Sequence, residues 1–197
     1  MCEMSEDFML KDKRIVKIRD LSIDDFKKNQ NYEFVHSWLE QIDKYLGKDF
    51  KIENLEQDRQ EFIDLISNND NIFLVGALDQ GRIVAFSSLS LNTTLQKEKH
   101  VGRWGITVNP EYQNQGIGKK LLSRIEEIAI KRGIKRLEAE FYEGNKSAEI
   151  LYLKKLNYVL EGRRKFAGHL KDGSYVDKIL IGKIIDPSII DKSRRKN

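Results

Sequence analysis

Two glycines, Gly116 and Gly118, stand one residue apart in the stretch QNQGIGKKLL, and an apolar helical pattern begins directly after them. The first turn of a helix leaves backbone N–H groups without partners and carries the positive end of the helix dipole, so it binds phosphate readily. A glycine has no Cβ and lets a phosphate approach the backbone closely. The stretch therefore predicts a loop for a phosphate-bearing ligand; the alternative is a tight connection between a strand and a helix.

Two familiar phosphate loops do not fit this stretch. The loop G-x-x-x-x-G-K-[ST] needs a glycine where Gln113 stands and a hydroxyl where Lys120 stands. The dinucleotide fingerprint G-x-G-x-x-G needs a third glycine in place of Leu121. Gly105 lies inside the preceding strand, where a glycine marks a bulge or a close approach to a ligand. The strand, the turn at Pro110 and the glycine loop together indicate a site for a long ligand with a phosphate end.

Composition narrows the class of protein. The chain has 197 residues, of which 40% are hydrophobic and 9% aromatic, as in an ordinary folded domain. A single cysteine, Cys2, excludes an internal disulfide framework, and three scattered histidines lead us to expect no metal site. The net charge of +4 arises from 35 basic and 31 acidic residues mixed along the chain, which argues against nucleic acid as a partner.

The chain shows no membrane signal. No run approaches the roughly 20 apolar residues that span a bilayer, and the N-terminus lacks the core of a signal peptide. We therefore expect a cytoplasmic protein that does not bind a membrane.

Hydrophobic periodicity and turn residues predict the order of elements. Helices are expected over 23–46 with a break near Asn29, over 55–66, from Ile117 to a cap at Gly133, and from the N-cap residue Asn145. Strands are expected at 14–19, 71–78, 82–91, 100–108, 135–141, 157–168 and 175–185. Strands and helices mixed around one sheet predict a single α/β (α+β) domain.

Two stretches resemble one protein family. ITVNPEYQNQGIGKKLL looks like the acetyl-CoA-binding segment of the GNAT superfamily of N-acetyltransferases, whose loop reads [QR]-x-x-G-x-[GA]; Gln113, Gly116 and Gly118 fill its three places. NKSAEILYLKKLNYVLEG resembles the family pattern N-x-x-A-x-x-L-Y followed shortly by K-x-G-F. The matching residues are Asn145, Ala148, Leu151, Tyr152 and Lys155, whereas Asn157 replaces the glycine and Tyr158 the phenylalanine.

The resemblance implies a fold and its boundaries. It implies a mostly antiparallel mixed sheet of about seven strands, splayed in the middle and flanked by helices, in an N-acetyltransferase domain over 14–186. Residues 1–13 are expected to be a flexible segment, and residues 187–197 a mobile basic tail. The protein is expected to be a monomer or a homodimer.

The resemblance also implies acetyl-CoA as co-substrate, lying between the strand at 105–108 and the strand at 135–141. Backbone amides of Ile106 and Val108 would hold the pantetheine arm, and amides from the glycine loop the pyrophosphate. Asn145 would contact the cofactor arm, and Lys154 or Lys155 would reach its 3′-phosphate. The residues implied are Ile106, Thr107, Val108, Gln113, Asn114, Gln115, Gly116, Ile117, Gly118, Lys119, Asn145, Tyr152 and Lys155.

Acetyl transfer from a thioester to an amine needs an unprotonated amine, a hydrogen-bond donor to the carbonyl oxygen and a proton for the departing thiolate. The resemblance places Tyr152 at the position of that acid. The alternative is an amphipathic tyrosine that packs beside Ala148 and Leu151 on the helix face.

The base that deprotonates the amine is less evident. Glu138 and Glu140 alternate with the apolar residues of LEAEF, and two carboxylates on one face of a central strand are costly unless they line a wet cavity. They are candidates to bind or deprotonate an amine; the alternative is salt bridges to neighbouring lysines. Relatives often carry a glutamate before the loop, where Arg103 and Trp104 stand here, so a base acting through water is expected.

The sequence thus predicts an enzyme that transfers the acetyl group of acetyl-CoA to a primary amine: an amino acid, a small amine, a polyamine or a protein N-terminus. A weak base favours amines that lose their proton easily, so we expect faster turnover on α-amino groups than on lysine side chains. The alternative is a non-catalytic acyl-CoA-binding or interaction module on the same fold.

Overall fold

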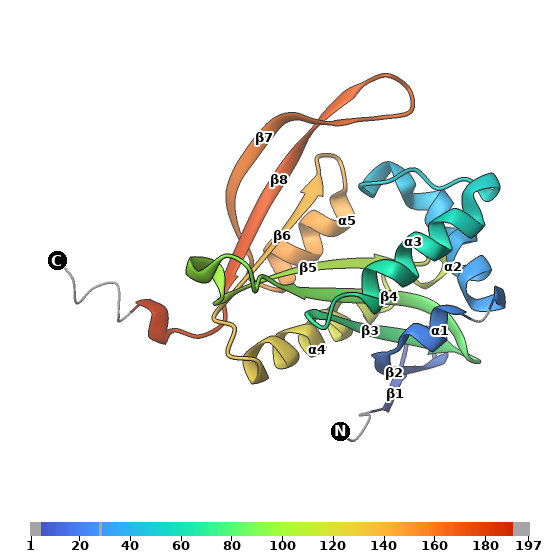
Figure 1. Cartoon of the computed structure of the whole chain (residues 1–197), viewed down its shortest axis with the longest axis horizontal. Helices are drawn as coiled ribbons and strands as arrows, with labels where there is room; N and C mark the ends of the chain where they lie inside the picture. Colours follow the sequence, from blue (N-terminus) through green and yellow to red (C-terminus); the bar gives the residue numbers. More distant parts are fainter. Residues whose placement is uncertain (1–4, 28, 191–197) are drawn as a thin grey trace. The chain divides into compact units, whose positions relative to one another are not determined.

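The structure, a computed structural model, describes residues 5–27 and 29–190. Its strands are hydrogen-bonded in one sheet in the order β1-β2-β3-β4-β5-β6-β8-β7. The registers of β1 with β2, β2 with β3, β6 with β8 and β7 with β8 are antiparallel, and β5 runs parallel to β6. The expected fold class, mixed α/β with a mostly antiparallel sheet, is therefore confirmed (Figure 1).

The elements follow the predicted order. The strands are β1 Glu6–Met9, β2 Ile15–Leu21, β3 Ile72–Asp79, β4 Arg82–Leu91, β5 Val101–Val108, β6 Arg136–Tyr142, β7 Val159–His169 and β8 Tyr175–Ile184. The α-helices are α1 Ile23–Lys27, α2 Asn29–Ile42, α3 Leu55–Ser67, α4 Ile117–Lys131 and α5 Lys146–Glu149. A π-helix, Ile150–Lys155, continues α5, and 3₁₀ turns cover Asp43–Tyr45, Ile52–Asn54, Gln96–Glu98 and Pro110–Tyr112.

The contacts divide the chain into two compact units. Unit 1 comprises residues 1–88 and 106–122, and unit 2 comprises residues 89–105 and 123–197. Strands β4 and β5 and helix α4 run from one unit into the other.

The core of unit 1 forms where α1, α2 and α3 pack against β3 and β4 (Figure 1). Tyr32, Val35 and Leu39 recur at helical spacing on α2, so that this helix turns an apolar face to the strands. Trp38, 1% exposed, lies in the same core, and its indole Nε1 donates to the carbonyl of Ile83 at 3.3 Å. Trp38 therefore packs in the core of unit 1.

The N-terminal segment differs from its expectation. Residues 6–9, placed in a flexible segment by the sequence, form strand β1, which pairs antiparallel with β2 through Phe8 opposite Val16. The chain reverses at Lys13, whose φ is 70°. Residues 1–4 and most of the expected basic tail, 191–197, lie outside the described residues.

Unit 2 is built on β6. Its register joins it to β5 over Val101–Arg103 and to β8 along its whole length. Leu137 of β6 and Ile181 of β8 are 0% and 1% exposed, so these strands carry the core of this unit. β7 and β8 form a long hairpin that continues past the end of β6 (Figure 1), and its turn contains Gly173 at a φ of 83°.

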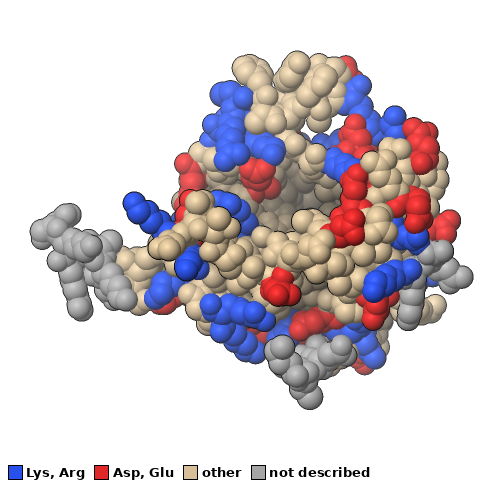
Figure 2. Space-filling model, viewed as in Figure 1, with Lys and Arg blue, Asp and Glu red and all other residues tan. Residues whose placement is uncertain are grey.

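The surface carries both signs of charge. Lysine and arginine side chains lie interspersed with aspartate and glutamate over the visible face (Figure 2). In the part of the chain that the structure describes, no helix is long and apolar enough to cross a membrane.

Candidate functional site

The glycine loop connects the 3₁₀ turn Pro110–Tyr112 to α4, inside unit 1. Asn114 and Gly116 both have positive φ, 61° and 96°, so the backbone between Gln113 and Ile117 turns sharply before the helix begins. A positive φ favours glycine because a side chain there strains the backbone. Gln113 fixes the start of the loop, because its Nε2 donates to the carbonyl of Val108 at 3.2 Å.

The loop leaves backbone donors at the start of α4. The first turn of the helix holds the amides of Ile117, Gly118 and Lys119, and helical geometry gives such groups no partner within the helix. Among the described residues no hydrogen bond from them to another part of the chain is found. Lys119 is exposed at the same place. Free donors at the positive end of a 15-residue helix suit an anion such as a pyrophosphate.

The β1–β2 hairpin supports the loop from the side. The backbone N–H of Asp12 donates to Oε1 of Gln115 at 3.2 Å, and the ring of Phe8 lies 3.5 Å from where a Cβ on Gly116 would stand. Glu6 pairs with Lys120 of α4 at 2.8 Å. Sequence analysis missed this support because β1 is only four residues long, and nothing in its pattern indicates a partner a hundred residues away.

The end of β5 that belongs to unit 1 carries Ile106, Thr107 and Val108, the residues expected to hold the pantetheine arm. Each is partly exposed. The hydroxyl of Thr107 is buried and has no hydrogen-bond partner among the described residues. A buried hydroxyl without a partner destabilises the fold, and such groups in native proteins call for an explanation.

The second motif lies in unit 2 and forms α5 with its π-helical continuation. Asn145 is the N-cap, because its Oδ1 accepts from the N–H of Ala148 at 3.1 Å. That bond uses one of the two lone pairs of the oxygen, so the other lone pair and the amide group remain for a cofactor contact. Lys155 ends the π-helix and is exposed. A π-helical turn is rare and is often found at functional sites.

Tyr152 lies in this π-helix and is 8% exposed. Its ring packs edge-to-face on Trp104 of β5, with centroids 4.9 Å apart, and on Phe141 of β6 at 5.7 Å. Burial raises the pKa of the Tyr152 phenol above its ordinary value near 10. The hydroxyl is therefore protonated at neutral pH and can donate a hydrogen bond.

Tyr158 contacts the same indole. Its ring centroid lies 5.2 Å from that of Trp104, and it is 3% exposed. Burial, and then the charge of Glu126, raise the pKa of Tyr158 as well. The hydroxyl of Tyr158 is enclosed without a hydrogen-bond partner among the described residues, and the family pattern assigns it no proton-transfer role.

The two candidate bases are engaged in ion pairs. Glu138 lies 3.1 Å from Nε of Arg136 and 3.6 Å from Nε of Arg103. Glu140 pairs with Lys178 at 2.5 Å and with Arg164 at 3.4 Å. The alternative that the sequence left open, salt bridges to neighbouring basic residues, therefore describes what these side chains do in unit 2.

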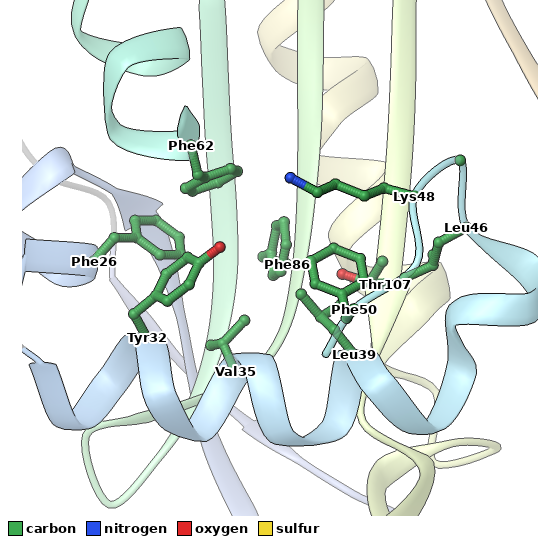
Figure 3. A pocket seen from close by; sticks show the side chains of 11 residues that line it. Phe26, Tyr32, Val35, Leu39, Leu46, Lys48, Phe50, Phe62, Phe86 and Thr107 are labelled. Atoms are coloured by element: carbon green, nitrogen blue, oxygen red, sulfur yellow. The ribbon is translucent and has the colours of Figure 1, made fainter. Parts of the chain in front are cut away.

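A cavity of about 260 Å³ lies in unit 1 (Figure 3). α1, α2, α3, the 46–50 loop, β4 and β5 contribute to its walls. The lining is almost wholly apolar and is dominated by five aromatic rings, those of Phe26, Tyr32, Phe50, Phe62 and Phe86. We call it the aromatic pocket.

The aromatic pocket has three polar groups. The hydroxyl of Tyr32 and the ammonium of Lys48 point towards the middle of the lining residues in Figure 3, and Thr107 reaches the pocket from β5. Burial first, and then the charges of Asp58 and Glu61, raise the pKa of Tyr32, so this hydroxyl remains a donor. No hydrogen bond of this hydroxyl is found among the described residues.

A chain of polar contacts, running from the surface to a buried histidine, holds Lys48 at the pocket. Its Nζ lies 2.6 Å from Oδ1 of Asp58 and 2.5 Å from Oε2 of Glu61. The other oxygen of Asp58 lies 3.1 Å from Nε2 of His36, which is fully buried. These hydrogen bonds raise the pKa of Lys48 and lower that of Glu61, so both stay charged at neutral pH.

Little in the amino-acid sequence indicates this pocket. Its aromatic residues lie on α1, α2, α3, β4 and a loop, and each fits the apolar pattern of its own element. Asp58 reads as an ordinary acidic residue in the first turn of α3, although its side chain is 2% exposed. A charged residue on the buried face of α3 would have indicated the polar network. Which face of the helix is buried, however, is known only from the tertiary contacts.

Comparisons with known proteins agree with the fold and the motifs. A family model described as the acetyltransferase (GNAT) family matches residues 35–158, more than half of the chain. The match covers both the glycine loop and Tyr152.

Individual relatives share limited sequence identity with this chain. A bovine (Bos taurus) thialysine N-epsilon-acetyltransferase is 30% identical over 70 residues, which span 36% of this chain and 41% of that protein. An acetyltransferase of the GNAT family from Streptococcus pneumoniae shares the fold with a TM-score of 0.66 and 24% identity, covering 86% of this chain and 99% of its own. YncA, a putative acetyltransferase from Salmonella typhimurium solved with its cofactor acetyl-CoA, has a TM-score of 0.69 at 17% identity, covering 87% and 94%.

At these identities the solved structures establish the fold alone, and the bovine match is confined to a short stretch. The family model, which covers the greater part of the chain, establishes the membership. The chain belongs to the acetyltransferase (GNAT) family.

Proposed function

We propose that this protein transfers the acetyl group of acetyl-CoA directly to a primary amine, with Tyr152 as the general acid. The observation that carries the proposal is the family match, which includes the glycine loop and Tyr152 in one continuous stretch. The bovine relative is named as an N-epsilon-acetyltransferase, and Salmonella YncA was solved with acetyl-CoA. The first name supports an amine acceptor, and the second supports acetyl-CoA as the co-substrate.

The loop residues fit the pyrophosphate of such a ligand. The amides of Ile117, Gly118 and Lys119 would donate to its oxygens, while Gln113, Asn114, Gln115 and Gly116 give the backbone its turn. Ile106 and Val108, with Thr107 between them, would hold the pantetheine arm. The amide group of Asn145 and the exposed Lys155 are further candidates for cofactor contacts.

Acetyl-CoA supplies the thioester, whose carbonyl carbon bonds to the amine nitrogen while the carbon–sulfur bond breaks. A thiolate leaving in water has a pKa near 8.5, lower than that of a phenol, so a tyrosine is a poor acid for it there. Burial raises the pKa of a thiol as it does that of a phenol, so the proton transfer depends on how closely the hydroxyl is positioned at the sulfur. The protonated Tyr152 hydroxyl would then donate to the departing sulfur.

The amine must also lose a proton. Glu138 and Glu140 stay candidates for this role, but an incoming amine would have to displace an arginine or a lysine from either carboxylate. A base that acts through a water molecule avoids that exchange, and we favour it.

The proposal is tested by binding and by turnover. Calorimetric titration should give a one-to-one complex with acetyl-CoA, and a panel of primary amines should release CoA thiol in amounts equal to the acetylated amine. Binding without thiol release on any amine would instead identify a non-catalytic acyl-CoA-binding module. No binding would rule out both functions.

A further inference from the structure

We propose that the aromatic pocket of unit 1 binds the body of the acceptor, and that the acceptor is a primary amine with an aromatic group and no second charge. This inference rests on the proposed acetyl transfer, whose substrate class it names.

The size and lining of the pocket carry the first step. At about 260 Å³ it lies just below the range of ordinary ligand pockets, and a dry cavity of about 150 Å³ in another protein binds benzene. One aromatic group with a short chain therefore fits. Phe62 already lies edge-on to Phe26, with ring centroids 4.8 Å apart, so a further ring can adopt the same favourable geometry.

The position of Thr107 gives the acceptor a direction. It lines the pocket from β5, between the two residues proposed to hold the pantetheine arm. Its buried hydroxyl lacks a partner, so an amine nitrogen placed there would satisfy it. With the nitrogen at Thr107, the aromatic body extends among the rings of Tyr32, Phe62 and Phe86, and the reacting atom stays beside the strand proposed for the cofactor.

The charges at the pocket disfavour a second charge on the acceptor. Both oxygens of Asp58 are engaged, by Lys48 and His36, and those of Glu61 accept from Lys48 and from Gln57 at 2.9 Å. Each oxygen of these two carboxylates already has a hydrogen-bonding partner, so the further ammonium groups of a polyamine would have to compete with Lys48, His36 and Gln57 for them. A free carboxylate gains little from Lys48, whose charge two carboxylates already oppose. A single ammonium fits, because aromatic faces attract cations and because the two negative charges of Asp58 and Glu61 exceed the one positive charge of Lys48.

Four acceptors distinguish the effects of an aromatic ring, a carboxylate and additional positive charges. They are phenylalaninamide, alaninamide, free phenylalanine and spermidine. The two amides share the same α-amine and differ by a ring, whereas free phenylalanine adds a carboxylate and spermidine adds cations. The proposal expects kcat/KM for phenylalaninamide to exceed that for alaninamide at least about tenfold, since a single methylene in an apolar pocket already changes it 10- to 200-fold. It also expects phenylalaninamide to exceed phenylalanine and spermidine. Equal values for the two amides, or a preference for spermidine, would overturn it.

Two substitutions locate the ring. Val35→Phe fills the pocket from α2 and should raise KM for phenylalaninamide about tenfold or more, with alaninamide far less affected. Because extra volume can also disturb the core, Phe62→Leu gives a second reading, with an expected rise of about two- to tenfold from one lost aromatic contact. Phe34→Leu is the matched control, because Phe34 packs against the same core without lining the pocket. An equal effect of Phe34→Leu would assign the change to stability and overturn the inference.

Direct binding separates this inference from the proposed function. Calorimetric titration of phenylalaninamide into the wild-type protein should show binding that Val35→Phe abolishes. If that binding is seen but no amine is acetylated, the pocket assignment stands and the acetyl transfer falls. If amines are acetylated and phenylalaninamide has no advantage, the function stands and the pocket assignment falls.

Discussion

The glycine loop and the aromatic pocket lie in the same compact unit and meet β5 at neighbouring residues, yet different parts of the chain build them. The loop is made by seven consecutive residues, 113–119, and it offers backbone amides. The pocket is made by side chains from five helices and strands and a loop, and it offers ring faces and three polar groups. The carbonyl of Val108 accepts a hydrogen bond from Gln113 of the loop, and Thr107, one residue earlier, lines the pocket.

This difference bears on which kind of site the members of a family share and which kind varies from one member to another. A backbone site depends on glycines and on a helix start, so its pattern is short and survives changes elsewhere. A side-chain pocket can change with any of its lining residues. Under the proposed function we therefore expect the cofactor side to be common to the family and the acceptor side to carry the specificity of this chain.

The largest expected effect tests the motif-built side at its chemical step. Tyr152→Phe keeps the ring on Trp104 and removes only the hydroxyl, so kcat should fall by about 10²–10⁴ with little change in KM for acetyl-CoA. Single-turnover kinetics, where chemistry is rate-limiting, measure the effect.

Tyr158→Phe is the matched control for that substitution. It removes a hydroxyl from a ring on the same indole, at 5.2 Å, and should leave kcat within about twofold of the wild type. Equal losses in the two variants would mean that the hydroxyls act through packing around Trp104 and not as a proton donor.

The next effect concerns the loop backbone. Gly116→Ala places a Cβ at a φ of 96° and should cost about 1–2 kcal/mol of folding stability, while acetyl-CoA affinity falls about tenfold as the loop shifts. Gly133→Ala introduces a comparable strain at a φ of 73°, beyond the other end of α4, where a Cβ meets open space. Denaturant unfolding should show similar losses for both, but calorimetry should show weaker cofactor binding for Gly116→Ala alone.

Much of the fold could be predicted from the sequence. Apolar periodicity located α2, α3, α4 and the long strands, and Gly133 and Asn145 marked helix ends where the structure has them, the first at a φ of 73° and the second as an N-cap. The signals are local, because caps and alternation act within a few residues. β1 could not be predicted in this way, since four residues stabilised by a partner strand carry almost no pattern of their own.

The candidate site divides along the same line. The loop and Tyr152 could be proposed from the sequence because short motifs mark them. Glu138 and Glu140 were selected as candidates to bind or deprotonate an amine, and cations that pair with them come from β5, β7 and β8, which the pattern of their own strand does not reveal. The aromatic pocket was missed because each ring looks like core until the elements come together. A short-range signal cannot distinguish a filled core from a hollow one.

A smaller effect tests the pocket side. Thr107→Val removes a buried hydroxyl without a partner and keeps the shape of the side chain, so the free energy of unfolding should rise by about 1 kcal/mol. If the hydroxyl binds the acceptor amine, KM for the amine should rise about three- to tenfold, more than KM for acetyl-CoA. Tyr158→Phe, which also removes a buried hydroxyl without a partner, should leave KM for the amine unchanged. A more stable Thr107→Val enzyme with unaltered acceptor kinetics would limit Thr107 to a packing role.

The smallest expected effect tests whether the N-terminal hairpin tunes the loop. Glu6 pairs with Lys120 one residue beyond the loop, and so opposes positive charge where a pyrophosphate is proposed to bind. Glu6→Gln should tighten acetyl-CoA binding about two- to threefold, because exposed ion pairs are worth only about 0.2–1 kcal/mol, and the gain should fade as salt screens the charges. Glu127→Gln makes the same charge change farther along α4, where Glu127 pairs with Arg124 at 3.1 Å, and should leave the affinity unaltered. Weaker binding in Glu6→Gln would mean that the ion pair positions the hairpin against the loop, so that the backbone site depends on side chains after all.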